Sequence, residues 1–82
     1  MENKIVAVYW LDAAFMLNED EETIEGWLEA GGESACTVGF LYKSNEKCVI
    51  IAQEAFTDGS YRGLTMIPNS MITQIEVLKN GN

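Results

Sequence analysis

The alternation of apolar and polar positions predicts a chain built mainly from β-strands. Runs rich in β-branched and aromatic residues, which favour strands, are separated by polar turns along most of the chain. The expected strands cover residues 4–11, 34–42, 47–53, 61–67 and 71–78. A single 3₁₀ turn is expected at residues 68–71, because Pro68 cannot donate a hydrogen bond to a sheet ladder.

The segment between the first two strands has the pattern of a short acidic helix over residues 18–30. Asn18 and Glu21 have the spacing of a capping box at its start, and Gly31-Gly32 is a natural end. Acidic residues crowd the first turn, where the helix dipole favours negative charge. One apolar stripe follows helical spacing and consists of Ile24, Trp27 and Leu28.

A polar turn sets the expected positions of the two cysteines. A hairpin centred on Ser44-Asn45 places Cys48 opposite Leu41 and Cys36 opposite Gln53, so the thiols do not meet. Secreted domains of this size normally carry several disulfides. Both cysteines are therefore expected to be buried free thiols.

Asp58-Gly59 gives the strongest turn signal in the chain. A two-residue hairpin turn centred there places Phe56 opposite Tyr61 and Ala55 opposite Arg62. The strands on either side of this turn are therefore expected to pair as antiparallel neighbours.

Together these elements predict a mostly β fold. It is a small five-stranded, SH3-like, partly open barrel, with one short acidic helix between its first and second strands. A five-stranded OB-like barrel is the competing topology. The 82 residues form one domain, residues 1–82. A chain this short buries little apolar area, so we expect it to form a homo-oligomer.

The charges are distributed unevenly along the chain. Its net charge is −8 at pH 7. Residues 1–41 hold nine acids and one base, Lys4, whereas residues 42–82 hold four acids and four bases. The whole negative excess therefore belongs to the first half. This balance argues against direct binding to a nucleic-acid phosphate backbone.

The residue types offer no recognisable catalytic machinery. Histidine is absent, and two cysteines are too few for a thiolate zinc site. No glycine-rich phosphate loop is present. Asn18, Asp20, Glu22 and Glu29 have EF-hand-like spacing, but Thr23 stands where that loop needs glycine. We expect a protein that is not an enzyme and that uses no metal or other cofactor.

The chain is expected to lie in the cytoplasm. The apolar run over residues 5–11 is far too short to cross a bilayer, and the N-terminus lacks the order of a signal peptide. We therefore expect no membrane partner.

Two groups of residues are candidates for binding. The first suits a basic protein surface: Glu19, Asp20, Glu21, Glu22, Glu25, Trp27 and Glu29. A solvated face that keeps the chain soluble explains the same acids, and Trp27 then fixes the helix to the barrel. The second group suits stacking of a base beside a phosphate: Tyr42, Lys43, Tyr61 and Arg62. Ordinary strand packing is the alternative for this group.

Short motifs along nearly the whole chain resemble those of a family of small, mostly uncharacterised phage proteins. The motifs lie at residues 8–13, at Trp27, and at residues 37–42 and 67–72. The family pattern is Val-x-Trp-x-Asp-Ala, a lone Trp, Ser-Val-Gly-Trp-Leu-Val and Ile-Pro-Lys-Ser-x-Ile. The chain departs from it at Thr37, Phe40 and Asn69. The resemblance implies an SH3-like barrel and a phage origin, and brings no established activity.

We therefore expect a phage-type protein that binds and neutralises a host component in the host cytoplasm. The leading partner is a host protein, such as a defence factor, with a basic surface that meets the acidic half. The first alternative is an oligomeric sponge that sequesters a small anionic ligand, such as a signalling nucleotide. The second alternative is a structural or accessory component of the phage.

Overall fold

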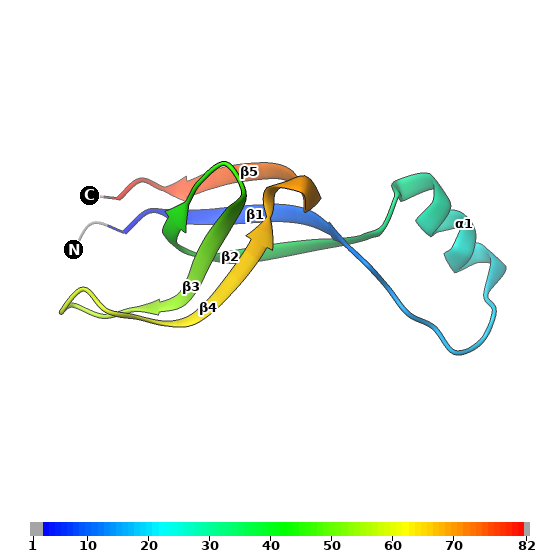
Figure 1. Ribbon diagram of the computed structural model, residues 1–82, viewed down its shortest axis with the longest axis horizontal. Coiled ribbons are helices and arrows are strands. Elements are labelled where there is room, and N and C mark those ends of the chain that lie inside the picture. The colour runs from blue at the N-terminus through cyan, green and yellow to red at the C-terminus, as the bar shows by residue number, and fades with distance from the viewer. Residues whose placement is uncertain (1–2, 82) are drawn as a thin grey trace.

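The computed structural model describes residues 3–81 and is mostly β. Five antiparallel strands form one sheet, and one helix lies between the first two strands (Figure 1). The elements are β1 (Ile5–Asp12), α1 (Glu21–Ala30), β2 (Glu33–Ser44), β3 (Cys48–Ala55), β4 (Tyr61–Pro68), the 3₁₀ turn η1 (Asn69–Met71) and β5 (Ile72–Lys79). The predicted fold class, its late one-turn break and its acidic helix are confirmed.

The strand order is β4-β3-β2-β1-β5. The first four strands pair with their neighbours in sequence, and η1 then returns the chain so that β5 pairs with the free side of β1. This is the SH3-like arrangement, with β4 and β5 as the two edges of an open sheet. As a result, β1 lies between the strand that follows it in sequence and the last strand of the chain.

One face of the sheet carries a small core. Alternate residues of a strand point to the same face, and those of β1, β3 and β4 converge on one cluster. Its members are Val6, Val8, Val49, Ile51 and Ile67, with Trp10, Leu41 and Ile72 packed against it. The Trp10 indole Nε1 donates a hydrogen bond to the Thr37 hydroxyl at 3.0 Å, which satisfies its polar atom at the edge of the core.

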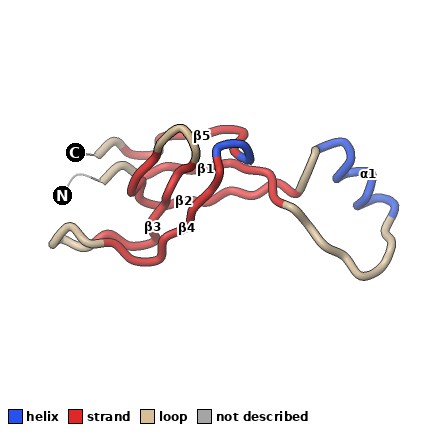
Figure 2. Tube along the Cα trace, in the orientation of Figure 1, coloured by secondary structure: helices blue, strands red, loops and turns tan. Residues whose placement is uncertain are grey.

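The helix lies outside the sheet rather than on it. We call residues 13–32, which connect β1 to β2 and include α1, the arm. The arm projects beyond the ends of the strands, and the molecule measures 50 × 21 × 21 Å (Figures 1 and 2). No residue of α1 is buried. Trp27 therefore does not join the core, which is closed by strand residues alone; it links the helix to the sheet through a hydrogen bond to Glu33, the first residue of β2.

The turn at Asp58-Gly59 is one residue longer than predicted. The Phe56 N–H donates to the Ser60 carbonyl at 2.8 Å, and the Gly59 N–H donates to the Phe56 carbonyl at 3.0 Å. Gly59 has a φ of 92°, as in a three-residue hairpin loop with a left-handed last residue. The register slips by one residue, so Ala55 rather than Phe56 lies opposite Tyr61.

The turn between β2 and β3 lies two residues later than predicted, since Ser44 pairs with Val49 and the Asn45 N–H donates to the Cys48 carbonyl at 3.0 Å. The Asn45 side-chain oxygen accepts hydrogen bonds from the Lys47 and Cys48 N–H groups at 2.8 and 3.0 Å. This side chain holds the turn, and Leu41 pairs with Ile51 rather than with Cys48.

The cysteines are free, as predicted, but they are not both buried. Cys36 is exposed and lies opposite Tyr9 in the β1–β2 ladder, beyond the reach of Gln53. Cys48 is half-buried at the start of β3.

Gly39 allows β2 to pass close to β3, and we predict that Gly39→Ala destabilises the fold. An added Cβ would lie 2.5 Å from the Ile51 Cγ2 and 2.6 Å from the Ala52 carbonyl oxygen. Overpacking of this kind costs about 1–3 kcal/mol, measurable by urea denaturation. Gly26→Ala is the control, because nothing lies within 4 Å of its added Cβ. Equal losses of stability in the two variants would contradict the prediction.

Candidate functional site

The helix of the arm is held by its own end groups. Asp20, not Asn18, is the N-cap: its side chain accepts hydrogen bonds from the Thr23 N–H at 3.5 Å and the Thr23 hydroxyl at 2.8 Å. Asp20 is the better cap because Thr23, three residues later, supplies both donors. At the other end, Gly31 has a φ of 84° and donates its N–H to the Trp27 carbonyl at 2.8 Å.

The acids predicted to bind a partner are all exposed on the arm. These are Glu19, Asp20, Glu21, Glu22, Glu25 and Glu29. The arm contains no lysine or arginine, so its own residues cannot neutralise them. Among the described residues, the one ion pair joins Arg62 to Glu54 on the β3–β4 hairpin, at the opposite end of the molecule (Figure 1). All the charged side chains of the arm are therefore negative.

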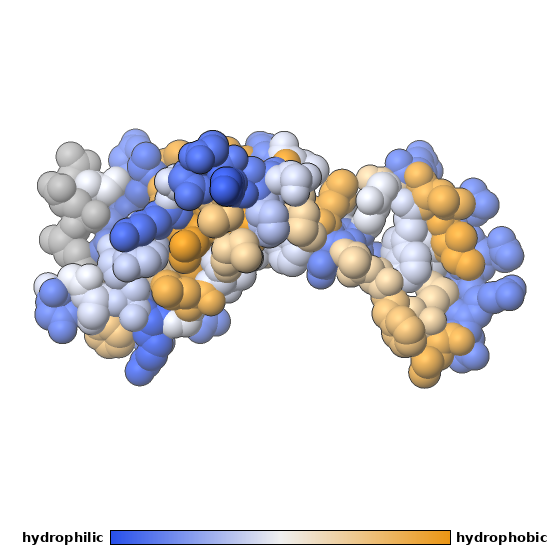
Figure 3. All heavy atoms as spheres, in the orientation of Figure 1, coloured by the Kyte–Doolittle hydropathy of each residue, from blue (hydrophilic) through white to orange (hydrophobic). Residues whose placement is uncertain are grey.

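The arm also exposes large apolar side chains, of which Leu28 belongs to the predicted apolar stripe whereas Phe15 and Leu17 were not predicted as site residues. Phe15 is 83% exposed, Leu17 87% and Leu28 74%. In Figure 3 hydrophobic atoms gather on the arm beside strongly hydrophilic ones. The sequence signal for Phe15 and Leu17 was the apolar run at residues 13–17. This run does not alternate as a strand does, and it precedes the predicted helix. Large apolar side chains exposed together on one segment are typical of interaction sites.

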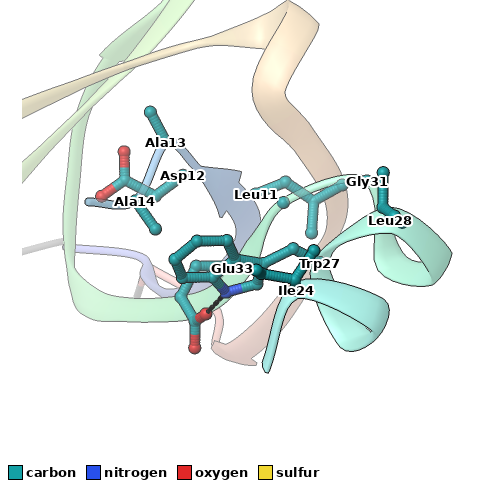
Figure 4. Close-up of a pocket in the computed structure, with 10 residues that line it drawn as sticks. Leu11, Asp12, Ala13, Ala14, Ile24, Trp27, Leu28, Gly31 and Glu33 are labelled. Atoms are coloured by element: carbon teal, nitrogen blue, oxygen red, sulfur yellow. Dashed lines mark hydrogen bonds between the residues drawn. The ribbon is translucent and has the colours of Figure 1, made fainter. Parts of the chain in front are cut away.

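A hollow of about 370 Å³ lies where the arm joins the sheet (Figure 4). Its lining comes from the end of β1, the arm and the start of β2: Leu11, Asp12, Ala13, Ala14, Ile24, Trp27, Leu28, Gly31, Gly32 and Glu33. Apart from two carboxylates, these are apolar residues and glycines. The Trp27 indole Nε1 donates a hydrogen bond to Glu33, which orients the ring in the hollow.

Trp27 was predicted either to pack on the barrel or to lie exposed among the acids, and the structure places it instead in hollows lined by the arm. It is half-buried, and besides this hollow it lines a second one of about 410 Å³ with residues 14–19 and Ile24. Trp27 therefore stands between two concave surfaces of the arm.

Three of the four residues in the second predicted group come together. The Tyr42 and Tyr61 ring centroids are 4.7 Å apart with an interplanar angle of 56°, and the Lys43 Nζ lies 5.5 Å from the Tyr42 centroid. The Tyr61 hydroxyl donates to the Asn3 side-chain oxygen at 2.7 Å. This arrangement offers aromatic faces and one cation.

Arg62, the fourth member, is turned away and already paired. Its Nε and Nη2 each donate to a Glu54 carboxylate oxygen at 2.7 Å, and the guanidinium lies 5.3 Å from the Phe56 ring centroid. Successive strand residues point to opposite faces, so Arg62 and Tyr61 diverge. The hydrogen bond from Arg62 lowers the pKa of Glu54. The two N–H donors that Arg62 could offer to an anion are already occupied by this carboxylate.

Residues 3–81 contain no group of three or more side chains that could hold a metal ion. Their helices are too short to cross a membrane.

Comparison with models of protein families, with curated proteins and with solved structures finds no match to this chain. What the chain does is therefore inferred from the arm and from the tyrosine pair.

The Asp20 cap gives the arm a defined pH dependence. Hydrogen bonds from the Thr23 hydroxyl, and then from its N–H, lower the pKa of Asp20 below its ordinary 3.8. Because the folded-state pKa is depressed, the cap stabilises the helix above this pH and is lost as the pH falls through the lowered pKa. We expect the Asp20 carboxyl, followed by ¹³C NMR, to titrate below 3.8.

Thr23→Val is the control for this titration, because it removes the hydroxyl donor and keeps the backbone N–H. The pKa of Asp20 should then move back toward its ordinary value. An identical titration in the variant would show that the hydroxyl does not hold the carboxylate.

Proposed function

We propose that the chain is a non-enzymatic binding protein that docks a basic host protein on its arm. The observation that carries the proposal is the combination found there: exposed acids with no base, and large apolar side chains that are at least 74% exposed. A solvated acidic face explains the acids alone. It does not explain why Phe15, Leu17 and Leu28 face solvent.

The energetics favour a partner for this surface. Burying one large aliphatic or aromatic side chain gains about 1.5–3 kcal/mol, and a protein interface combines such an apolar centre with a polar rim. Trp27 is the residue type most enriched among interface hot spots. The acids around it would steer a basic surface toward the arm and reject an acidic one.

The resemblance to small phage proteins supports a host component as the partner. In this proposal the chain occupies the basic surface of a host defence protein in the host cytoplasm and so neutralises it. An accessory role in the phage particle is the competing outcome. We place the expected self-association on the exposed apolar residues of the sheet, Val38, Leu64 and Met66, because the acidic arms of two copies would repel each other.

Charge reversal on the helix should abolish partner binding. In the variant Glu25→Lys/Glu29→Lys, Glu21 stands four residues before the first new lysine. A glutamate and a lysine at this spacing attract each other and stabilise a helix, so the helix should persist. Glu46→Lys/Glu76→Lys is the matched control, with the same charge change on exposed residues of the β2–β3 turn and of β5. Immobilised protein and both variants would be incubated with host lysate, and retained proteins quantified by mass spectrometry.

We expect the wild type and the control to retain a basic host protein. The arm variant should bind this protein with an affinity at least about tenfold lower, a loss of about 1.4 kcal/mol or more. Its retention should also fall when salt is raised from about 0.1 M to about 1 M, which shortens the Debye length from about 10 to about 3 Å. Equal retention by both double variants would contradict the proposal, and recovery only from phage particles would favour the accessory role.

Capture of a small anionic ligand is the second candidate function, and the Tyr42–Tyr61 pair beside Lys43 favours it. Because Arg62 is held by Glu54, this candidate depends on Lys43. Equilibrium dialysis with adenosine monophosphate tests it. Lys43→Ala should then lose about tenfold in affinity, while Arg62→Ala, which loses the same charge, should not. Equal affinity of the two variants would remove the candidate.

A further inference from the structure

The hollow at the root of the arm has a chemistry that selects its occupant. Its volume of about 370 Å³ falls in the range of about 300–1,000 Å³ typical of ligand pockets. Leu11, Ile24 and Leu28 supply apolar walls, whereas the two polar side chains, Asp12 and Glu33, are both acidic. The site therefore suits a group that is apolar along its length and positively charged at its end.

The two acidic residues are held side by side by the backbone. Asp12 and Glu33 lie directly opposite each other in the last pair of the β1–β2 ladder. Gly32 brings the strands into close approach, since an added Cβ there would lie 3.1 Å from the Asp12 carbonyl oxygen and 3.2 Å from the Leu11 Cβ. Like charges in directly opposed positions destabilise a ladder. A cation between them would relieve this repulsion.

Trp27 completes the site with an aromatic surface. Its indole nitrogen is turned to Glu33, as Figure 4 shows, so the ring lines the hollow beside the carboxylate that it orients. A guanidinium stacks favourably on an indole ring and is more weakly hydrated than an ammonium. Its five N–H donors match two carboxylates better than the three donors of a lysine do.

We infer that this hollow receives an arginine side chain of the basic partner. The inference rests on the proposed function and adds the kind of residue that anchors the partner. The arginine stem packs between Ile24 and Leu11, the guanidinium stacks on Trp27, and its N–H groups donate to Asp12 and Glu33. An apolar side chain would leave both carboxylates without a cation, and an anionic group would be repelled.

NMR of the ¹⁵N-labelled protein tests this inference directly. The chain has two tryptophans, so two indole N–H signals are expected. Trp10 packs against the core and serves as an internal reference. The probe is a short glycine–serine peptide with one central arginine, compared with the same peptide carrying neutral citrulline. We expect the arginine peptide to shift the Trp27 signal to saturation while Trp10 stays fixed, and the citrulline peptide to shift neither.

Glu33→Gln removes the charge and keeps an oxygen that can accept from the Trp27 indole. This variant should bind the arginine peptide with about tenfold lower affinity than the wild type does. Glu46→Gln, which removes one charge from the distant β2–β3 turn, should change the affinity by less than twofold. An unchanged Trp10 signal verifies that each variant is folded. Equal affinities in these variants, or equal shifts by arginine and citrulline, would overturn the inference.

The two proposals can fail separately. If the helix charge reversal releases the host protein while the arginine peptide leaves Trp27 unshifted, the arginine site is wrong and the proposed function stands. If the arginine peptide binds at Trp27 while both double variants retain the same host proteins, the site stands and the proposed function is wrong.

Discussion

The burial of Val6 and Val8 against β3 and β4 is the interaction on which the rest of the structure depends. These two residues belong to β1, which pairs on one side with β2 and on the other with β5, the last strand of the chain. Burial of their side chains therefore holds the two ends of the chain together and folds the open sheet over its core. The arm leaves from the end of this same strand, so a strand with three buried residues, Val6, Ala7 and Val8, leads into the exposed arm.

Sheet and arm are stabilised by different forces. The sheet depends on a few large buried side chains and on long antiparallel ladders. The arm has no core; its helix is fixed by the Asp20 cap, by Gly31 in the left-handed region and by the link from Trp27 to Glu33. Local unfolding of the arm therefore leaves the buried contacts of the sheet intact. Binding of a partner would supply the apolar burial that the arm lacks within its own chain.

Much of the fold could be predicted from the sequence, because alternation and turn residues are local signals. The turn lengths could not, because Asp58-Gly59 fits both a two- and a three-residue loop. That one residue mattered for function: the predicted register placed Ala55 opposite Arg62 and hid the ion pair with Glu54. The acids of the arm were identified correctly as exposed. The position of the helix was not, because an apolar stripe has the same spacing whether it faces its own core or a partner.

Since no residue of α1 is buried, the core of the sheet places no demand on its sequence, and only the cap at Thr23 and the link from Trp27 to Glu33 constrain it locally. Substitutions between the Asp20 cap and Gly31 change the charge and shape presented to a partner at little cost to the sheet. Most binding surfaces evolve under the opposite condition, because their residues also support a core. A lineage carrying this fold could therefore follow a partner that alters its own surface, one tolerated substitution at a time. The sheet would act as a constant scaffold for a rapidly diversifying recognition element.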